Sequence, residues 1–209
     1  MTSDLDRRSP LARLAQRQLV HGPGVHELSN TAIHRGRVFD VAHTEVRLPS
    51  GLEQRFDVVL HAGAAAIAAI DDDGRLLCVR QYRIPAGDWL LEIPAGRLEP
   101  GEDPLCAAQR ELEEETGQRA AHWSLLRRFF PAVGFCTEVI HLFLATGLTP
   151  AREGRLEADD DEELEVVRAT PEELLAAEPA DAKTLVAALL VQARRGAHSA
   201  GTTEHSPAS

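Results

Sequence analysis

Residues 96–117 of the chain read GRLEPGEDPLCAAQRELEEETG, and their acidic side chains recur at helical spacing. Glu114 and Glu115 follow Glu111 by three and four residues, so a helix places both beside Glu111 on one stripe. Like charges at this spacing repel by roughly 0.2–0.5 kcal/mol per pair, and the stripe therefore calls for a neutralising partner. Because the opposite side of the helix is apolar, we expect it to anchor the carboxylates as a site for a hard divalent cation.

The bounds of this helix follow from its flanking residues. Asp103 can cap the first turn, Pro104 suits the first helical position, and Gly117 suits the end. A simpler interpretation stays open at this point, because most glutamate-rich helix faces are only solvated surfaces. Arg110 precedes Glu114 by four residues, which is also the spacing of an ordinary surface ion pair.

The complete spacing of the segment resembles the signature of the Nudix hydrolase family. Its fixed positions are occupied by Gly96, Glu102, Arg110, Glu111, Leu112, Glu114, Glu115 and Gly117. The last position of the signature is aliphatic in the family and is Gln118 here. Strand patterns with few helices between them independently favour an α+β layered sandwich. The resemblance implies a Nudix-type α/β/α sandwich with a mixed sheet and an N-terminal antiparallel strand subdomain.

Composition changes along the chain predict its organisation. The expected parts are a disordered arm over residues 1–25, an N-terminal β subdomain over 26–61, a Nudix hydrolase domain over 62–195 and a disordered tail over 196–209. Two further helices are predicted in the hydrolase domain. One begins at the capping box of Thr170 and Glu173, and the other spans Asp181 to Arg194.

Charge and hydropathy exclude several classes of partner. The formal net charge of −11 argues against binding to a nucleic-acid polymer, and it means that bound cations must help to attract a phosphate-containing substrate. No apolar stretch reaches the length of a membrane span, so no membrane association is expected. The sequence therefore predicts a cytoplasmic protein.

The resemblance assigns metal-binding roles to residues of the signature. It implies Glu111 and Glu115 as Mg²⁺ ligands, with Mn²⁺ as a substitute. Glu114 is implied as a further ligand or an immediate catalytic neighbour, and the backbone carbonyl of Ala95 completes the coordination. Arg110 is implied to orient these carboxylates.

Three other segments resemble the ADP-ribose pyrophosphatase branch of the family: residues 80–83, 89–96 and 131–138. The resemblance implies that Arg83, Gly96 and Glu138 contact the substrate. It predicts hydrolysis of the diphosphate bond of ADP-ribose to AMP and ribose 5-phosphate. In the third segment Val133 stands where the branch has proline before glycine. The alternatives are the same reaction on another nucleoside diphosphate derivative, such as a nucleotide sugar or a dinucleotide, or a non-catalytic ligand sensor.

An acidic run, residues 159–163, resembles the loop that supplies the general base in this branch. Glu162 is the first choice for the base and for an extra metal ligand, and Asp160 is the second. Most acidic runs are solvated loops, so each single residue keeps that interpretation beside it. The resemblance also implies a homodimer in which the N-terminal strands are exchanged and help to hold the adenine.

Overall fold

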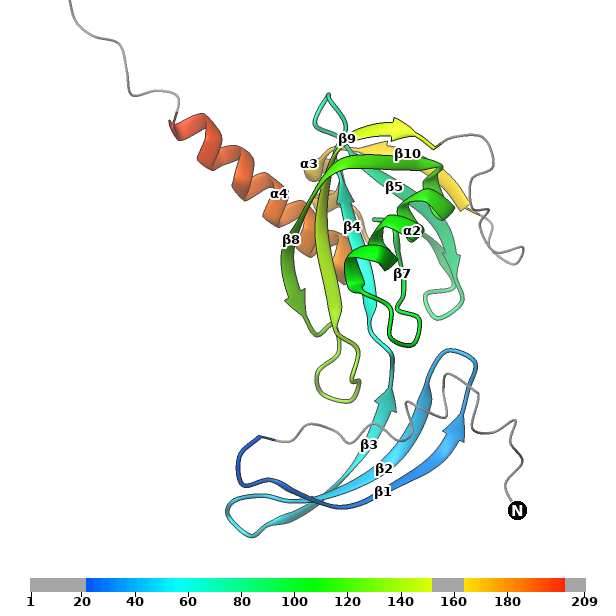
Figure 1. Ribbon diagram of the computed structural model, residues 1–209, viewed down its shortest axis with the longest axis vertical. Coiled ribbons are helices and arrows are strands. Elements are labelled where there is room, and N and C mark those ends of the chain that lie inside the picture. Colours follow the sequence, from blue (N-terminus) through cyan, green and yellow to red (C-terminus); the bar gives the residue numbers. More distant parts are fainter. Residues whose placement is uncertain (1–21, 152–163, 202–209) are drawn as a thin grey trace, which may run out of the picture. The chain divides into compact units, whose positions relative to one another are not determined.

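The computed structural model describes residues 22–151 and 164–201, and this part of the chain forms three sheets and three helices (Figure 1). The strands are β1 (His26–Arg35), β2 (Asp40–Arg47), β3 (Glu53–Leu60), β4 (Ala64–Ala69), β5 (Leu76–Arg83), β6 (Asp88–Glu92), β7 (Ala95–Arg97), β8 (Gln118–Phe129), β9 (Ile140–Pro150) and β10 (Leu164–Ala169). The helices are α2 (Pro104–Thr116), α3 (Pro171–Ala176) and α4 (Ala182–Gly201).

The chain divides into two compact units. The first comprises the chain up to Ala64 together with Arg97–Glu102 and Phe129–Ile140. The second comprises Ala65–Gly96, Asp103–Arg128 and the chain from His141 onwards.

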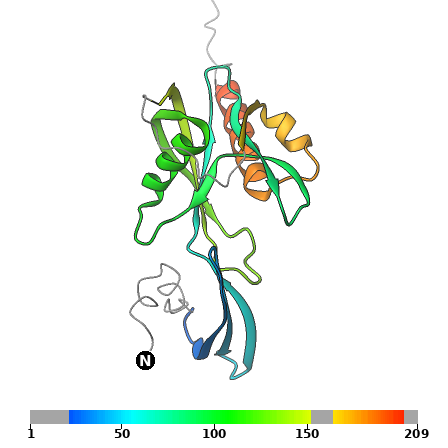
Figure 2. The ribbon, with the colours of Figure 1, turned by 90° about the vertical axis from the view of Figure 1, so that its right-hand side faces the viewer.

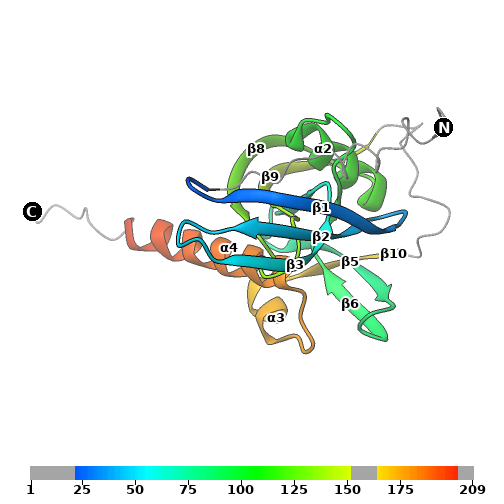
Figure 3. The same ribbon diagram turned by 90° about the horizontal axis from the view of Figure 1, so that it is seen from below.

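The first unit contains an antiparallel sheet in the order β1-β2-β3, which is clearest in Figure 3. In the central strand β2, Asp40, Ala42, Thr44 and Val46 are buried, whereas the residues between them are more exposed. This alternation is that of a strand with one face covered, since successive strand side chains point to opposite faces. Val59 of β3 also donates a backbone hydrogen bond to the carbonyl of Phe135, 2.7 Å away.

The second unit has the layered arrangement expected from the sequence. Its two sheets have the orders β7-β4-β9-β8 and β10-β5-β6. All six residues of β4 are buried, which is the pattern of a strand covered on both faces. Figure 2 shows α2 on one side of the strands and α3 and α4 on the other. The fold class is therefore α+β, as predicted.

Two element bounds differ from the expectations. β8 begins at Gln118, directly after α2, where the sequence analysis assigned no strand. It is an edge strand with many exposed side chains, so its alternation of apolar residues is weak. Helix α4 continues to Gly201, past Arg194.

The capping box predicted for α3 is confirmed, with hydrogen bonds in both directions between Thr170 and Glu173. Among the described residues, no helix is both long enough and apolar enough to cross a membrane.

Candidate active site

Helix α2 is held at both ends as its sequence predicts. The carboxylate of Asp103 accepts hydrogen bonds from the backbone N–H groups of Leu105 and Cys106, and Pro104 occupies the first turn. At the other end Gly117 adopts the left-handed conformation, with a φ of 65°, and donates to the carbonyl of Glu113. Leu112 is fully buried, so the apolar face fixes the helix against the core. The position of the acidic stripe is thereby determined.

Two carboxylates of the stripe lie against neighbouring backbone atoms of Ala95 and Gly96, at the start of β7. The Glu115 carboxylate accepts a hydrogen bond from the Ala95 N–H at 3.1 Å. The Glu111 carboxylate packs directly on the α-carbon of Gly96. A methyl group added there would lie 1.8 Å from its Cδ and Oε1 atoms. Gly96 is therefore required for the space that its missing side chain leaves, rather than for an unusual φ.

Arg110 supplies the positive charge that the stripe requires. Its Nη1 atom donates to Glu111 at 2.6 Å and to Glu114 at 2.9 Å, and all three side chains are largely buried. The structure thus brings together Arg110, Glu111 and Glu114 as expected. Glu113 serves a different purpose, because its carboxylate is paired in a two-bond contact with Arg119.

Arg83, at the end of β5, is held by a carboxylate that the sequence analysis did not single out. Its Nε and Nη2 atoms donate to Glu92 of β6 at 2.6 and 2.8 Å. These hydrogen bonds raise the pKa of Arg83 against the effect of burial, and the negative charge of Glu115 contributes in the same direction. Arg83 therefore lies within the electrostatic reach of the acidic stripe.

The chain matches the NUDIX domain over residues 59–189. It belongs to the Nudix family.

Relatives are similar in sequence to this chain over most of its length. ADP-ribose pyrophosphatase of Bacillus subtilis (strain 168) is 40% identical over 169 residues, which cover 79% of this chain and 91% of the relative. Methanol dehydrogenase activator of Bacillus methanolicus is 41% identical over 143 residues, covering 68% and 77%. A crystal structure of an ADP compounds hydrolase superposes with a TM-score of 0.72 at 23% identity, covering 86% of this chain and 98% of that one. This last likeness establishes the Nudix fold.

Nudix hydrolases generally need a divalent metal ion, and the donors in this chain fit one. Glu111, Glu115 and the Ala95 carbonyl are oxygen donors, which hard divalent cations prefer. Within residues 22–151 and 164–201, no three histidine, cysteine or acidic side chains are grouped for a metal. Hard cations that bind phosphates often use only one or two carboxylates and complete their coordination with water and substrate oxygens. The pair of Nudix-box carboxylates beside a backbone carbonyl is sufficient for this mode.

Glu138 lies in the first unit, beside His61. The His61 Nδ1 atom is 3.7 Å from a carboxylate oxygen of Glu138 and accepts a hydrogen bond from the Gly63 N–H at 3.1 Å. Burial lowers the pKa of His61, although the charge of Glu138 acts in the opposite direction. The Thr137 hydroxyl accepts a hydrogen bond from the His61 N–H at 2.9 Å. This bond joins the end of β3 to the segment between β8 and β9, next to Glu138.

The proposed bases, Glu162 and Asp160, lie outside the described residues. The sequence analysis missed Glu92, Lys183 and His61. Glu92 had a usable signal, since it is an acidic residue within the apolar strand segment Trp89–Ile93.

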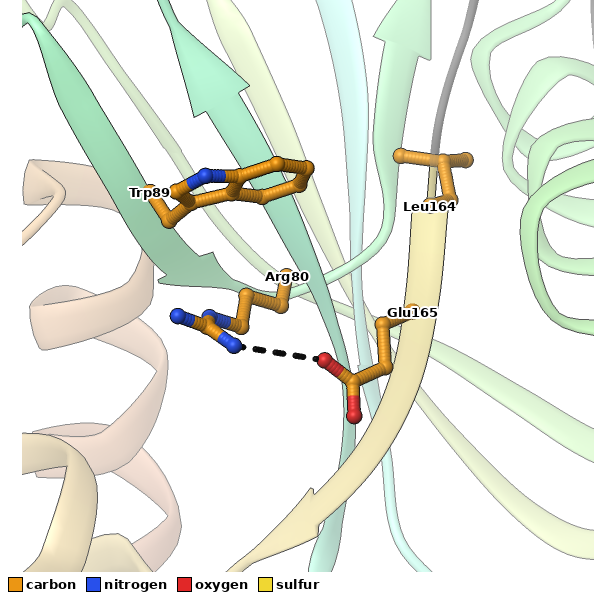
Figure 4. A pocket seen from close by; sticks show the side chains of 4 residues that line it. All are labelled: Arg80, Trp89, Leu164 and Glu165. Carbon is orange, nitrogen blue, oxygen red and sulfur yellow. Dashed lines mark hydrogen bonds and ion pairs between the residues drawn. The ribbon is translucent and has the colours of Figure 1, made fainter.

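A pocket of about 280 Å³ opens on the sheet β10-β5-β6 (Figure 4). Its lining residues are Arg80, Trp89, Leu164 and Glu165. The Arg80 guanidinium stacks on the Trp89 ring at 5.6 Å and lies 3.5 Å from the Glu165 carboxylate. None of the signature carboxylates lines this pocket.

Proposed function

We propose that the protein hydrolyses the diphosphate bond of ADP-ribose to AMP and ribose 5-phosphate, with Mg²⁺ as the metal and Mn²⁺ as a substitute. The observation that carries this proposal is the pair of carboxylates, Glu115 against the Ala95 N–H and Glu111 against the α-carbon of Gly96. The similarity to the Bacillus subtilis ADP-ribose pyrophosphatase over nearly its whole length supports the choice of substrate.

The metal is held in this proposal by Glu111, Glu115 and the Ala95 carbonyl. A bound divalent cation supplies a Lewis acid that neutralises phosphate charge and acidifies water. Arg110 keeps the Glu111 and Glu114 carboxylates in place through its two short hydrogen bonds. Glu114 is therefore proposed as an immediate neighbour that stabilises this arrangement.

The substrate is proposed to contact Arg83, Gly96 and Glu138. The Arg83 side chain is 40% exposed, which leaves part of the guanidinium available to a phosphate oxygen. Guanidinium groups suit this role because their planar fork matches phosphate geometry. Gly96 permits close approach to the backbone beside Glu111.

The general base is proposed to be Glu162, with Asp160 as the second candidate and Glu138 as the third. Glu162→Gln is expected to lower kcat by roughly 100–10,000-fold with a much smaller change in KM, because a base acts in the transition state. Steady-state kinetics on ADP-ribose measures both constants. A crippled Asp160→Asn variant beside a normal Glu162→Gln variant would reverse the order of the first two candidates. Normal activity in both would move the role to Glu138.

The substrate is tested with purified protein, Mg²⁺ and a panel of ADP-ribose, UDP-sugars and dinucleotides. We expect kcat/KM to be highest for ADP-ribose, by at least about tenfold, with AMP and ribose 5-phosphate as the products identified by chromatography. A higher kcat/KM for another compound would keep the chemistry and change the substrate. Turnover of none would favour a sensor, as would be consistent with a relative named as an activator.

We further propose a cytoplasmic homodimer that exchanges its N-terminal strands. The three-stranded sheet β1-β2-β3 carries exposed apolar side chains, among them Ile33 and Phe56, which a second copy would cover. Light scattering on the purified protein measures the mass, and a monomer would contradict this proposal.

A further inference from the structure

Glu92 is a buried carboxylate with two cationic partners. Its side chain is 3% exposed, and it accepts hydrogen bonds from Arg83 and from Lys183 of α4. Burial alone raises the pKa of a carboxyl group, but the bonds and charges of Arg83 and Lys183 together lower the pKa of Glu92. Glu92 is therefore ionised, and an ionised buried carboxylate is strongly unfavourable once its partners are removed.

Lys183 is the only lysine in the chain, which otherwise carries arginine as its basic residue. Its side chain is 13% exposed and contacts Glu92 and, at 3.1 Å, Asp181. The start of α4 fixes its position. Asp181 accepts hydrogen bonds from both the N–H and the hydroxyl of Thr184, and the Thr184 hydroxyl accepts one from the Ile93 N–H at 3.0 Å. This last bond joins the helix to the residue next to Glu92.

The charges in this network determine what Arg83 offers to a ligand. With Arg83 as the sole partner, the negative charge of Glu92 would cancel that of the guanidinium. Because Lys183 also contacts Glu92 and is itself contacted by Asp181, the charge of the buried carboxylate is shared between two cations while the Nε and Nη2 atoms of Arg83 stay anchored.

We infer that Lys183 is a positioning residue that acts through Glu92: it shares the charge of the buried carboxylate with Arg83 and keeps this carboxylate where it orients the Arg83 guanidinium for a substrate phosphate. The inference rests on the proposed function to the extent that Arg83 contacts the substrate. It extends that function to α4, which lies on the other side of the strands from α2, the helix that carries Glu111 and Glu115 (Figure 2).

Lys183→Gln removes the charge and keeps a hydrogen-bond donor for Glu92, so the fold is expected to persist. We expect kcat/KM for ADP-ribose to fall about tenfold, mainly through KM, because groups that orient a functional side chain are commonly worth about 10–100-fold. In an Arg83→Gln background, which leaves Glu92 neutral hydrogen-bond donors, Lys183→Gln should change kcat/KM by less than about twofold, since both changes remove the same effect. Lys183→Arg should restore most of the loss.

A merely structural role for Lys183 predicts a different pattern. The two losses would then multiply in the double variant, or Lys183→Gln would unfold, and either result would overturn the inference. Unchanged kcat/KM in Lys183→Gln would overturn it as well. Arg168→Gln, which removes an exposed cation paired with Asp71 in the same unit, is the matched control and should leave kcat/KM unchanged.

The inference is separable from the identity of the substrate. If another compound is hydrolysed fastest, the same variants are compared on that compound. If none is hydrolysed, calorimetric binding of inorganic pyrophosphate with Mg²⁺ replaces kcat/KM. The role of Lys183 would be supported if adding Lys183→Gln to the Arg83 variant caused no further loss of affinity for pyrophosphate. Losses that multiply in the double variant, or no binding by the parent protein, would refute it.

Discussion

Glu115→Gln is expected to lower kcat for ADP-ribose hydrolysis at least about a hundredfold while the protein stays folded. Groups that only orient metal ligands are worth about 10–100-fold, and a ligand should be worth more. Glutamine has nearly the same shape, and its side-chain oxygen can still accept the hydrogen bond from the Ala95 N–H. Because the substitution removes one charge from a self-repelling stripe, the melting temperature without Mg²⁺ should hold or rise slightly.

The same substitution at Glu113 provides a matched control on the same helix. Its carboxylate pairs with Arg119 rather than with the Ala95–Gly96 peptide. Glu113→Gln should therefore lower the melting temperature and leave kcat near the parent value. Near-parental kcat in Glu115→Gln, measured beside this control, would show that α2 does not hold the metal.

Gly96→Ala is the second substitution with a large expected effect. The new Cβ would lie 1.8 Å from the Glu111 carboxyl group, so this carboxylate must leave its position. The displaced atoms are the end of a flexible side chain, and we expect the free energy of unfolding to change by less than about 1 kcal/mol. Hydrolysis should nevertheless fall at least about a hundredfold, because Glu111, a proposed metal ligand, must leave its place beside Gly96.

Gly22→Ala is a suitable control for this prediction, since nothing lies within 4 Å of the added Cβ and the backbone has no positive φ there. Circular dichroism and steady-state kinetics on both variants separate folding from activity. Retained activity in Gly96→Ala would mean that Glu111 can hold a metal from another position. Unfolding would instead assign Gly96 a structural role.

Local interactions explain why much of the site was predictable. The limits of α2 depend on Asp103, Pro104 and Gly117, which act within one helical turn of its ends. The stripe of Glu111 and Glu115 follows from helical periodicity alone, and the capping box of α3 spans four residues. The resemblance to the Nudix signature then assigned a chemical meaning to residues whose positions were already fixed.

Contacts between distant segments explain what the sequence did not reveal. Glu92 and Lys183 lie 91 residues apart, and no periodicity relates a strand residue to the first turn of a later helix. The resemblance to the family singled out Arg83 as a substrate contact. Its hydrogen bonds to Glu92 depend on how β5 pairs with β6. Gly96 was recognised from the signature, whereas its contact with Glu111 depends on how α2 packs beside β7.

The single lysine allows the opening of the start of α4 to be followed by proteolysis. A protease specific for lysyl bonds has one possible site in this chain, and that site lies in the first turn of the helix, with the side chain 13% exposed. Cleavage of the native protein therefore requires this turn to open, so its rate reports the local opening equilibrium. A ligand that engages Arg83 should slow the cut by stabilising the network that holds Lys183.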